Sequence, residues 1–248
     1  MIKFFRKIRQ DLLSKGKTGK YLKYAIGEII LVVIGILIAL GINNWNQERI
    51  GHKKELDLLK NLKEELYQNV SIIKEIDSVY TLREKECKEG VAILKQASTV
   101  DMILKADSLL TTRWAVFRIN RSTYDEMLNN GSFYSLNNKG LKQAIRKHFT
   151  YANNYLKSFQ EINENGQDIA YNENLNIIDI LEDRMNNEYP TLKGLDTTWI
   201  TNQNSPQYLA LYKKGKYFTK TNRLRKRMIG QFIGSCEELA KRIEIEIK

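Results

Sequence analysis

Proline is almost absent from this chain of 248 residues, which contains only two. Because proline interrupts helices and is common in turns, this scarcity favours long helices over a turn-rich all-β fold. Cysteine and histidine are equally scarce, with two residues of each. The sequence therefore indicates neither a disulfide-stapled scaffold nor a metal site built from clustered Cys and His ligands.

Catalytic and cofactor-binding motifs are also missing. The chain has no phosphate-binding loop, dinucleotide fingerprint or nucleophile elbow. Its carboxylates lack the spacing of a calcium loop or of a di-iron bundle. We therefore expect no cofactor, no metal and no enzymatic activity. A periplasmic enzyme of unknown chemistry, using the polar segment 190–206, stays open as an alternative.

One long apolar run lies near the N-terminus. Residues 25–42 contain a single charge, Glu28, and as a helix they would span about 27 Å, close to the hydrocarbon thickness of a bilayer. Trp45 follows the run, as is typical of a membrane interface. We predict a transmembrane helix at 24–45. A cleavable signal peptide with Ala39-Leu40-Gly41 is the rival interpretation, but the run exceeds the usual signal core.

The flanking charges predict the orientation of this helix. The first 23 residues hold eight Lys or Arg and one Asp, which is +7 of the total +11. By the positive-inside rule, this basic leader stays in the cytoplasm and residues 46–248 form an extracytoplasmic domain. Phe5, Ile8 and Leu12 in the leader favour an amphipathic helix at the membrane surface. The expected partner is thus the lipid bilayer, and no nucleic acid is expected.

Three residues inside the span are candidates for helix packing or function. Glu28 is an ionisable group in an apolar helix, and such a group suggests a functional role. It also lies close enough to the membrane interface for its side chain to reach the interface by snorkelling. Gly35 and Ala39 form a small-xxx-small pair that could pack against a second helix.

Apolar residues downstream recur every three or four positions, which indicates amphipathic helices. The first stripe follows a candidate break at Gly51. A short helix is capped by Thr99 or Asp101, another begins at Ser122 and ends at Gly131, and a long one runs from Asn138 to Gly166. A less regular helix covers 169–185, and the last covers 221–247. The predicted fold is mainly α: one N-terminal transmembrane helix, then an extracytoplasmic bundle of four to five helices.

Cys87 and Cys236 lie on the apolar stripes of two long helices. Buried thiols explain such positions, and a disulfide between the first and last helices is the alternative in an oxidising compartment. His52 and His148 stand alone, and we interpret His148, beside Phe149, as a structural histidine of the core.

A basic segment near the C-terminus is the candidate binding surface. Between residues 213 and 227 there is no acidic residue, and aromatic residues are interspersed. The site for an anion or a protein partner is predicted at Lys213, Lys214, Lys216, Arg223, Arg225, Lys226 and Arg227. A solvated helix surface without a ligand is the simpler interpretation.

Two segments carry a family resemblance. The first segment is MIKFFRKIRQDLL followed by YAIGEIILVVIGILIALGINNWNQER, and the second is TYDEMLNNGSFYSLNNKGLKQAI. In these segments the chain resembles an uncharacterised flavobacterial family of single-pass membrane proteins, which is a domain of unknown function. The resemblance implies an anchor that is retained in the bacterial inner membrane, and it transfers no catalytic residue.

These observations favour a membrane-anchored helical interaction module of the cell envelope, binding a protein partner or an envelope ligand, with a homo-oligomer as one form of the partner. The alternative from another class is a subunit of an ion-coupled or transport assembly that uses Glu28.

Overall fold

The computed structural model of the chain describes residues 18–114, 118–186 and 194–248. The amphipathic leader at 1–17 and the expected loop residues 187–193 lie outside the described residues. The described residues are helical and contain no strand, which confirms the predicted mainly α fold. They divide into two compact units, one ending at Asp57 and the other beginning at Leu58.

Helix α2 runs from Thr18 to Lys95 and contributes to both units. The predicted break at Gly51 is wrong, because the helix continues through it. A single glycine costs a helix only about 1 kcal/mol, which the good helix formers on both sides offset. Gly51 therefore marks no domain boundary.

The first unit contains the apolar part of α2. Every large apolar side chain from Ile26 to Ile42 is exposed, from 47% for Val33 and Ile34 to 63% for Ile29. This is one helix that is long and apolar enough to cross a membrane. A helix that is apolar all round requires an apolar environment on all sides.

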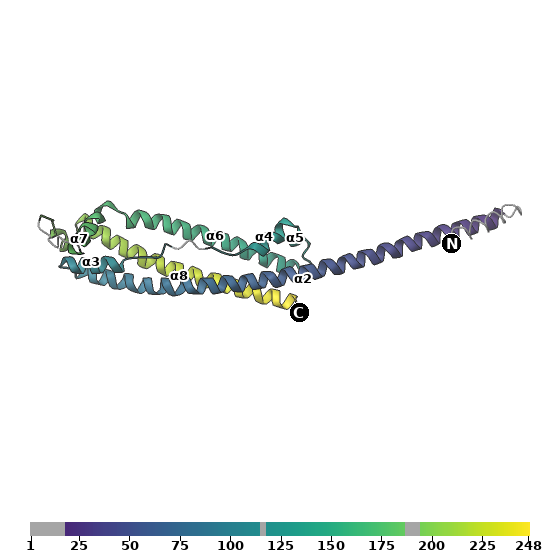
Figure 1. Ribbon diagram of the computed structural model, residues 1–248, viewed down its shortest axis with the longest axis horizontal. Helices are drawn as coiled ribbons and strands as arrows, with labels where there is room; N and C mark the ends of the chain where they lie inside the picture. Colours follow the sequence, from purple (N-terminus) through teal and green to yellow (C-terminus); the bar gives the residue numbers. More distant parts are fainter. Residues whose placement is uncertain (1–17, 115–117, 187–193) are drawn as a thin grey trace. The chain divides into compact units, whose positions relative to one another are not determined.

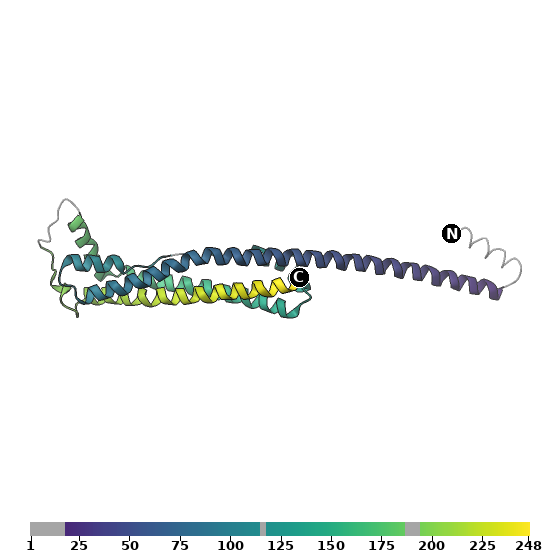
Figure 2. The same ribbon diagram turned by 90° about the horizontal axis from the view of Figure 1, so that it is seen from below.

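The second unit is built on three long helices: α2 from Leu58 onward, α6 (Lys139–Ala170) and α8 (Pro206–Glu246). Contacts between α6 and α8 pair Ile162 with Tyr217 and His148 with Ser235, so these two helices are antiparallel. Figures 1 and 2 show them side by side. The prediction of four to five helices was too low: the described part of the chain holds three long α-helices and four shorter ones that cover the ends of the bundle.

The connection from α2 to α6 returns along the bundle. It contains α3 (Val100–Leu109), α4 (Ser122–Asn129) and α5 (Ser132–Ser135). Thr99 caps α3 and Asn138 caps α6 through their side chains, as predicted. Gly131 has φ 79°, a left-handed conformation that fits the predicted end of the helix there and turns the chain from α4 into α5.

The connection from α6 to α8 contains η1 (Glu173–Leu175), α7 (Asn176–Asn186) and η2 (Thr198–Ile200). Two predicted boundaries are wrong here. Helix α6 continues past Gly166 to Ala170. Helix α8 begins at Pro206 rather than near Thr221, because Ser205 caps it and Pro206 occupies its first turn, where the missing N–H costs nothing.

Two apolar clusters hold the helices together. One contains Leu62, Phe149 and Phe232 from the three long helices. The other joins Leu94, Ile178 and other residues from the end of α2, from α3, α7, η2 and the beginning of α8. Gly90 and Gly215 let helices approach closely in this second region: a Cβ would lie 2.7 Å from Leu110 Cδ2 at Gly90, and 2.6 Å from Val91 Cγ2 at Gly215.

Candidate functional site: the outer face of helix α8

Four basic side chains share the outer face of α8. They are Lys213, Lys216, Lys220 and Arg223, all exposed, and their spacing of three and four residues aligns them on one side of the helix. We call this set the basic face. It surrounds a shallow hollow of about 580 Å³, which is also lined by Ile169, Tyr212, Tyr217 and Thr219.

One of the two tyrosines is fixed in place. The Tyr217 hydroxyl donates a hydrogen bond of 3.1 Å to the carbonyl oxygen of Ile162 on α6. Gly166, buried opposite, leaves room for the ring: a Cβ there would lie 3.4 Å from Tyr217 Cε1 and 2.8 Å from the Trp114 ring. The hollow therefore has one aromatic wall that is held by a hydrogen bond, beside exposed lysine side chains.

Not all basic side chains of the predicted patch remain available to a binding partner. Lys214 points inward, where its Nζ lies 2.6 Å from Asp107 Oδ1 and its side chain is 14% exposed. Arg223 Nε lies 2.9 Å from Glu84 Oε1 on α2. The hydrogen bond from Lys88 is the main cause that lowers the pKa of Glu84, ahead of the bond from Arg223. Lys213, Lys216 and Lys220 form no ion pair with any described residue.

Arg225 corrects the predicted patch, because it is 0% exposed and belongs to the interior. It lies seven residues after the buried Phe218, so helical periodicity turns it toward the core. Its Nη1 donates to Thr112 Oγ1 at 2.8 Å and its Nη2 to Asn163 Oδ1 at 2.7 Å. The guanidinium also lies 5.3 Å from the centre of the Tyr80 ring. Burial lowers the pKa of Arg225.

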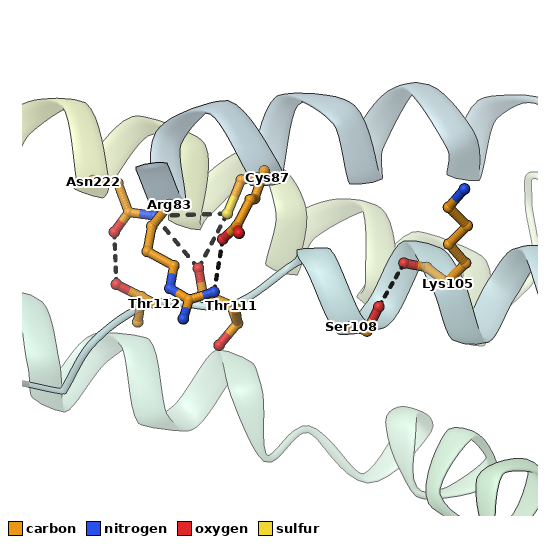
Figure 3. Close-up of polar contacts among 8 residues, drawn as sticks. Arg83, Cys87, Lys105, Ser108, Thr111, Thr112 and Asn222 are labelled. Carbon is orange, nitrogen blue, oxygen red and sulfur yellow. Dashed lines mark hydrogen bonds and ion pairs between the residues drawn. The ribbon is translucent and has the colours of Figure 1, made fainter. Parts of the chain in front are cut away.

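Cys87 lies next to these buried polar groups, and Figure 3 shows it with Thr111, Thr112 and Asn222. Its thiol donates to the Thr111 carbonyl oxygen at 3.2 Å, and Asn222 Nδ2 lies 3.6 Å from the sulfur. Thr112 Oγ1 donates to Asn222 Oδ1 at 2.6 Å. Burial raises the pKa of Cys87 to about 11, so this thiol is protonated and unreactive at neutral pH.

The alternative of a Cys87–Cys236 disulfide is wrong for this structure, in which both cysteines are free and buried. Cys87 contacts Asn222, and Cys236 lies fourteen residues further along α8, which is about 21 Å of helix. A disulfide requires Cα atoms within about 7 Å. Burial raises the pKa of Cys236 to about 12.

His148 is buried in the core, as predicted for a structural histidine. Its Nδ1 lies 2.8 Å from Ser235 Oγ. Burial lowers the pKa of His148 to about 4, so the ring is neutral at pH 7. The pair borders a groove of about 700 Å³ between α6 and α8, which Tyr151 and Gln231 also line. Within the described ranges, no three His, Cys, Asp or Glu residues are grouped as a metal site requires.

The anchor candidates stay predictions. Glu28 is half-buried, and a Cβ added at Gly35 would meet no atom within 4 Å. Gly35 therefore has open space beside it, which a second helix could fill. For Ala39 the structure gives only its place on the exposed helix.

Sequence reasoning missed a polar anchor between α2 and α4. Glu65 is 4% exposed, and its Oε2 accepts hydrogen bonds from the Thr123 N–H at 2.7 Å and from Ser122 Oγ at 2.9 Å. A carboxylate at a helix N-terminus satisfies free N–H groups and the helix dipole. The sequence signal for this contact was Glu65 itself, a polar residue that lies beside the apolar stripe of α2, directly before Leu66.

The structure also explains the second motif of the family resemblance. Tyr124 stacks on Phe149 with ring centres 4.0 Å apart and meets Phe133 edge to face at 5.6 Å. Gly131 makes the turn that brings Phe133 back to Tyr124. The motif therefore builds one end of the bundle and contributes no residue to the basic face.

Comparison with known proteins gives a family and no function. No curated protein and no solved structure matches the chain. The match to a family of unknown function (DUF6090) covers residues 28–193, which include most of α2, all of α6 and α7, but not α8. Since this match spans two thirds of its length, the chain belongs to the family of unknown function DUF6090.

Proposed function

We propose that this protein is a membrane-tethered helical module of the bacterial cell envelope that binds a protein partner through the basic face of α8. The observation that carries the proposal is the set of three exposed lysines, Lys213, Lys216 and Lys220, without an ion pair in the described chain, around a hollow with two tyrosines. Unpaired charges beside aromatic rings are typical of the rim and centre of a protein interface.

The composition of this face favours a protein partner over a simple anion. Leu209 and Leu224 continue the helical stripe of the lysines at its two ends, and they are 50% and 38% exposed. A phosphate or sulfate site needs convergent donors and no apolar border. Exposed leucines next to lysines match a partner that has both acidic and apolar side chains.

The membrane placement completes the proposal. The apolar part of α2 stays in the inner membrane as a single span, the basic leader is cytoplasmic, and the helical domain is periplasmic. Alkaline phosphatase fused after Lys248 is then active. An active cytoplasmic reporter at the same position, with inactive phosphatase, would contradict this orientation.

The binding role is tested by photo-crosslinking in native membranes. A photoreactive amino acid at position 216 in the full chain is expected to give protein adducts, and the same group at Lys85, an exposed lysine of α2, serves as the matched control. Replacing Lys213 and Lys220 by Gln in the position-216 variant should remove the adduct. An adduct pattern that is identical at 216 and 85 would argue against the basic face as an interface.

A further inference from the structure

Helix α6 carries an acidic stripe that matches the basic face. Glu161, Glu164 and Asp168 are exposed and follow one another at intervals of three and four residues. Lys213, Lys216 and Lys220 have the same intervals on α8. Both sets therefore project from one side of their helix over about two turns.

The two stripes lie at the same height of the bundle. Tyr217 bonds to Ile162 and faces Gly166, which sets residues 162–166 of α6 level with residue 217 of α8. Because the helices are antiparallel, Glu164 is level with Lys216, and Glu161 is level with Lys220. Asp168 is then level with Lys213.

The charges are not neutralised within one chain. None of the six side chains forms an ion pair with a described residue, and Glu164 accepts only a hydrogen bond from Gln160 at 2.8 Å. Each stripe lies on the side of its helix opposite the buried residues, such as Phe159 on α6 and Phe218 on α8. One chain thus presents an acidic and a basic surface of equal length, both open to a second molecule.

We infer that the partner of the basic face is a second copy of this chain, which binds as a parallel two-fold dimer. The inference rests on the proposed function and names its partner. A two-fold axis along the bundle places the acidic stripe of each copy against the basic face of the other, with residues of equal height opposed. It also keeps the Leu58 ends of both domains on one side, as anchors in one membrane require.

The energetics fit a dimer that forms on a membrane. One exposed ion pair contributes about 0–1 kcal/mol, so six such pairs alone make a weak complex in solution. Confinement to a membrane raises the local concentration of the copies. The exposed Leu209 and Leu224 add apolar contact at the two ends of the basic face.

Charge exchange between two differently tagged full-length copies tests the dimer. One variant carries Glu161→Lys, Glu164→Lys and Asp168→Lys; the other carries Lys213→Glu, Lys216→Glu and Lys220→Glu. Each variant alone opposes like charges, so its co-purification with itself from mild detergent should fall at least ~10-fold. Co-expression of the two variants opposes unlike charges at both contacts and should restore the complex.

The matched control reverses Lys85, Lys139 and Lys241, three exposed lysines outside the basic face that form no ion pair with a described residue. This control should self-associate like the unmodified chain. If the unmodified chain does not self-associate, or if the mixed variants fail to restore association while their helical content is unchanged, the dimer is wrong. Protein adducts at position 216 that contain a different protein would overturn the dimer and leave the proposed function standing.

A cysteine pair tests the direction of the axis without changing the other charges. In a parallel dimer, a copy with Glu161→Cys should form a disulfide with a copy carrying Lys220→Cys, and not with one carrying Lys213→Cys. A disulfide with Lys213→Cys and none with Lys220→Cys would overturn the parallel arrangement. Copies are expressed with Cys87 and Cys236 replaced by Ala, so that no native thiol contributes.

Discussion

The two parts of helix α2 have the same helical backbone but require different surroundings for their side chains. Val33 and Ile34 in the first part are each 47% exposed, and they are neighbours of apolar residues on every side. In the second part Leu62, Leu66 and Ile73 are 0% exposed, and polar residues such as Lys63, Glu64 and Gln68 lie between them. A continuous apolar run needs an apolar environment on every side, whereas a stripe needs one on a single side only.

The exposed fraction of a single side chain does not distinguish the apolar run from the amphipathic part of α2. Leu82, in the second part, is 52% exposed, slightly more than Val33. A single exposed apolar residue is normal on a soluble protein surface, whereas an unbroken apolar run from Ile29 to Ile42 is not. The pattern around a residue, and not its own exposure, therefore predicts which solvent it meets.

The largest effect is expected from charges placed in the first part. Val33→Lys together with Ile34→Lys should each cost about 3 kcal/mol of membrane insertion, because a charge near the centre of a span loses its hydration. Alkaline extraction of membranes should then release the protein. Leu82→Lys is the matched control and should leave the protein in the membrane fraction; release of both variants would contradict the assignment of the anchor.

The second largest effect concerns the two faces of α8. Arg225→Ala should lower the free energy of unfolding by about 4 kcal/mol, because it leaves a cavity and removes the donors to Thr112 and Asn163. Urea unfolding of the detergent-solubilised chain measures it. Lys216→Ala, on the outer face of the same helix, should change stability by less than ~0.5 kcal/mol. Equal losses for the two variants would disprove the inward position of Arg225.

A pH-dependent effect of intermediate size is expected from His148. Its pKa is about 4 in the folded chain and 6.5 in the reference state, so the unfolded chain binds the extra proton between these values. Stability should therefore fall as the pH drops from about 6.5 to 4, by about 3 kcal/mol in total. His148→Gln should flatten this part of the profile, and an unchanged slope would assign it to other groups.

The smallest effect on stability is expected from the basic face. Replacing Lys213, Lys216 and Lys220 by Gln should change the free energy of unfolding by less than ~0.5 kcal/mol, since none of them is paired in the described chain. The same variant should lose partner capture. A large loss of stability would show that these lysines belong to the fold and not to an interface.

Helix periodicity and capping could be predicted from the sequence. Leu59, Leu62 and Leu66 are buried as their spacing indicates, and Thr99 and Asn138 cap helices as expected. The beginning of α8 was harder to place. Its apolar stripe continues through Tyr208, Leu211 and Phe218, but the density of lysines and the small Gly215 obscure it.

The candidate site could be predicted only in part. Lys213 and Lys216 do lie on an exposed face, because a lysine without a partner favours water. Arg225 does not, because Thr112 and Asn163, 113 and 62 residues away, supply its acceptors. No local pattern reveals partners so distant in sequence.

The sequence by itself determined the apolar run of α2 and the helical stripes, because both depend on the order of apolar and polar residues along one helix. The tertiary structure decided the rest. It buried Arg225. It placed Cys87 of α2 against Asn222 of α8, far from Cys236 on the same helix α8. It also set the acids of α6 level with the lysines of α8, since relative height depends on how two helices pack and not on either sequence alone.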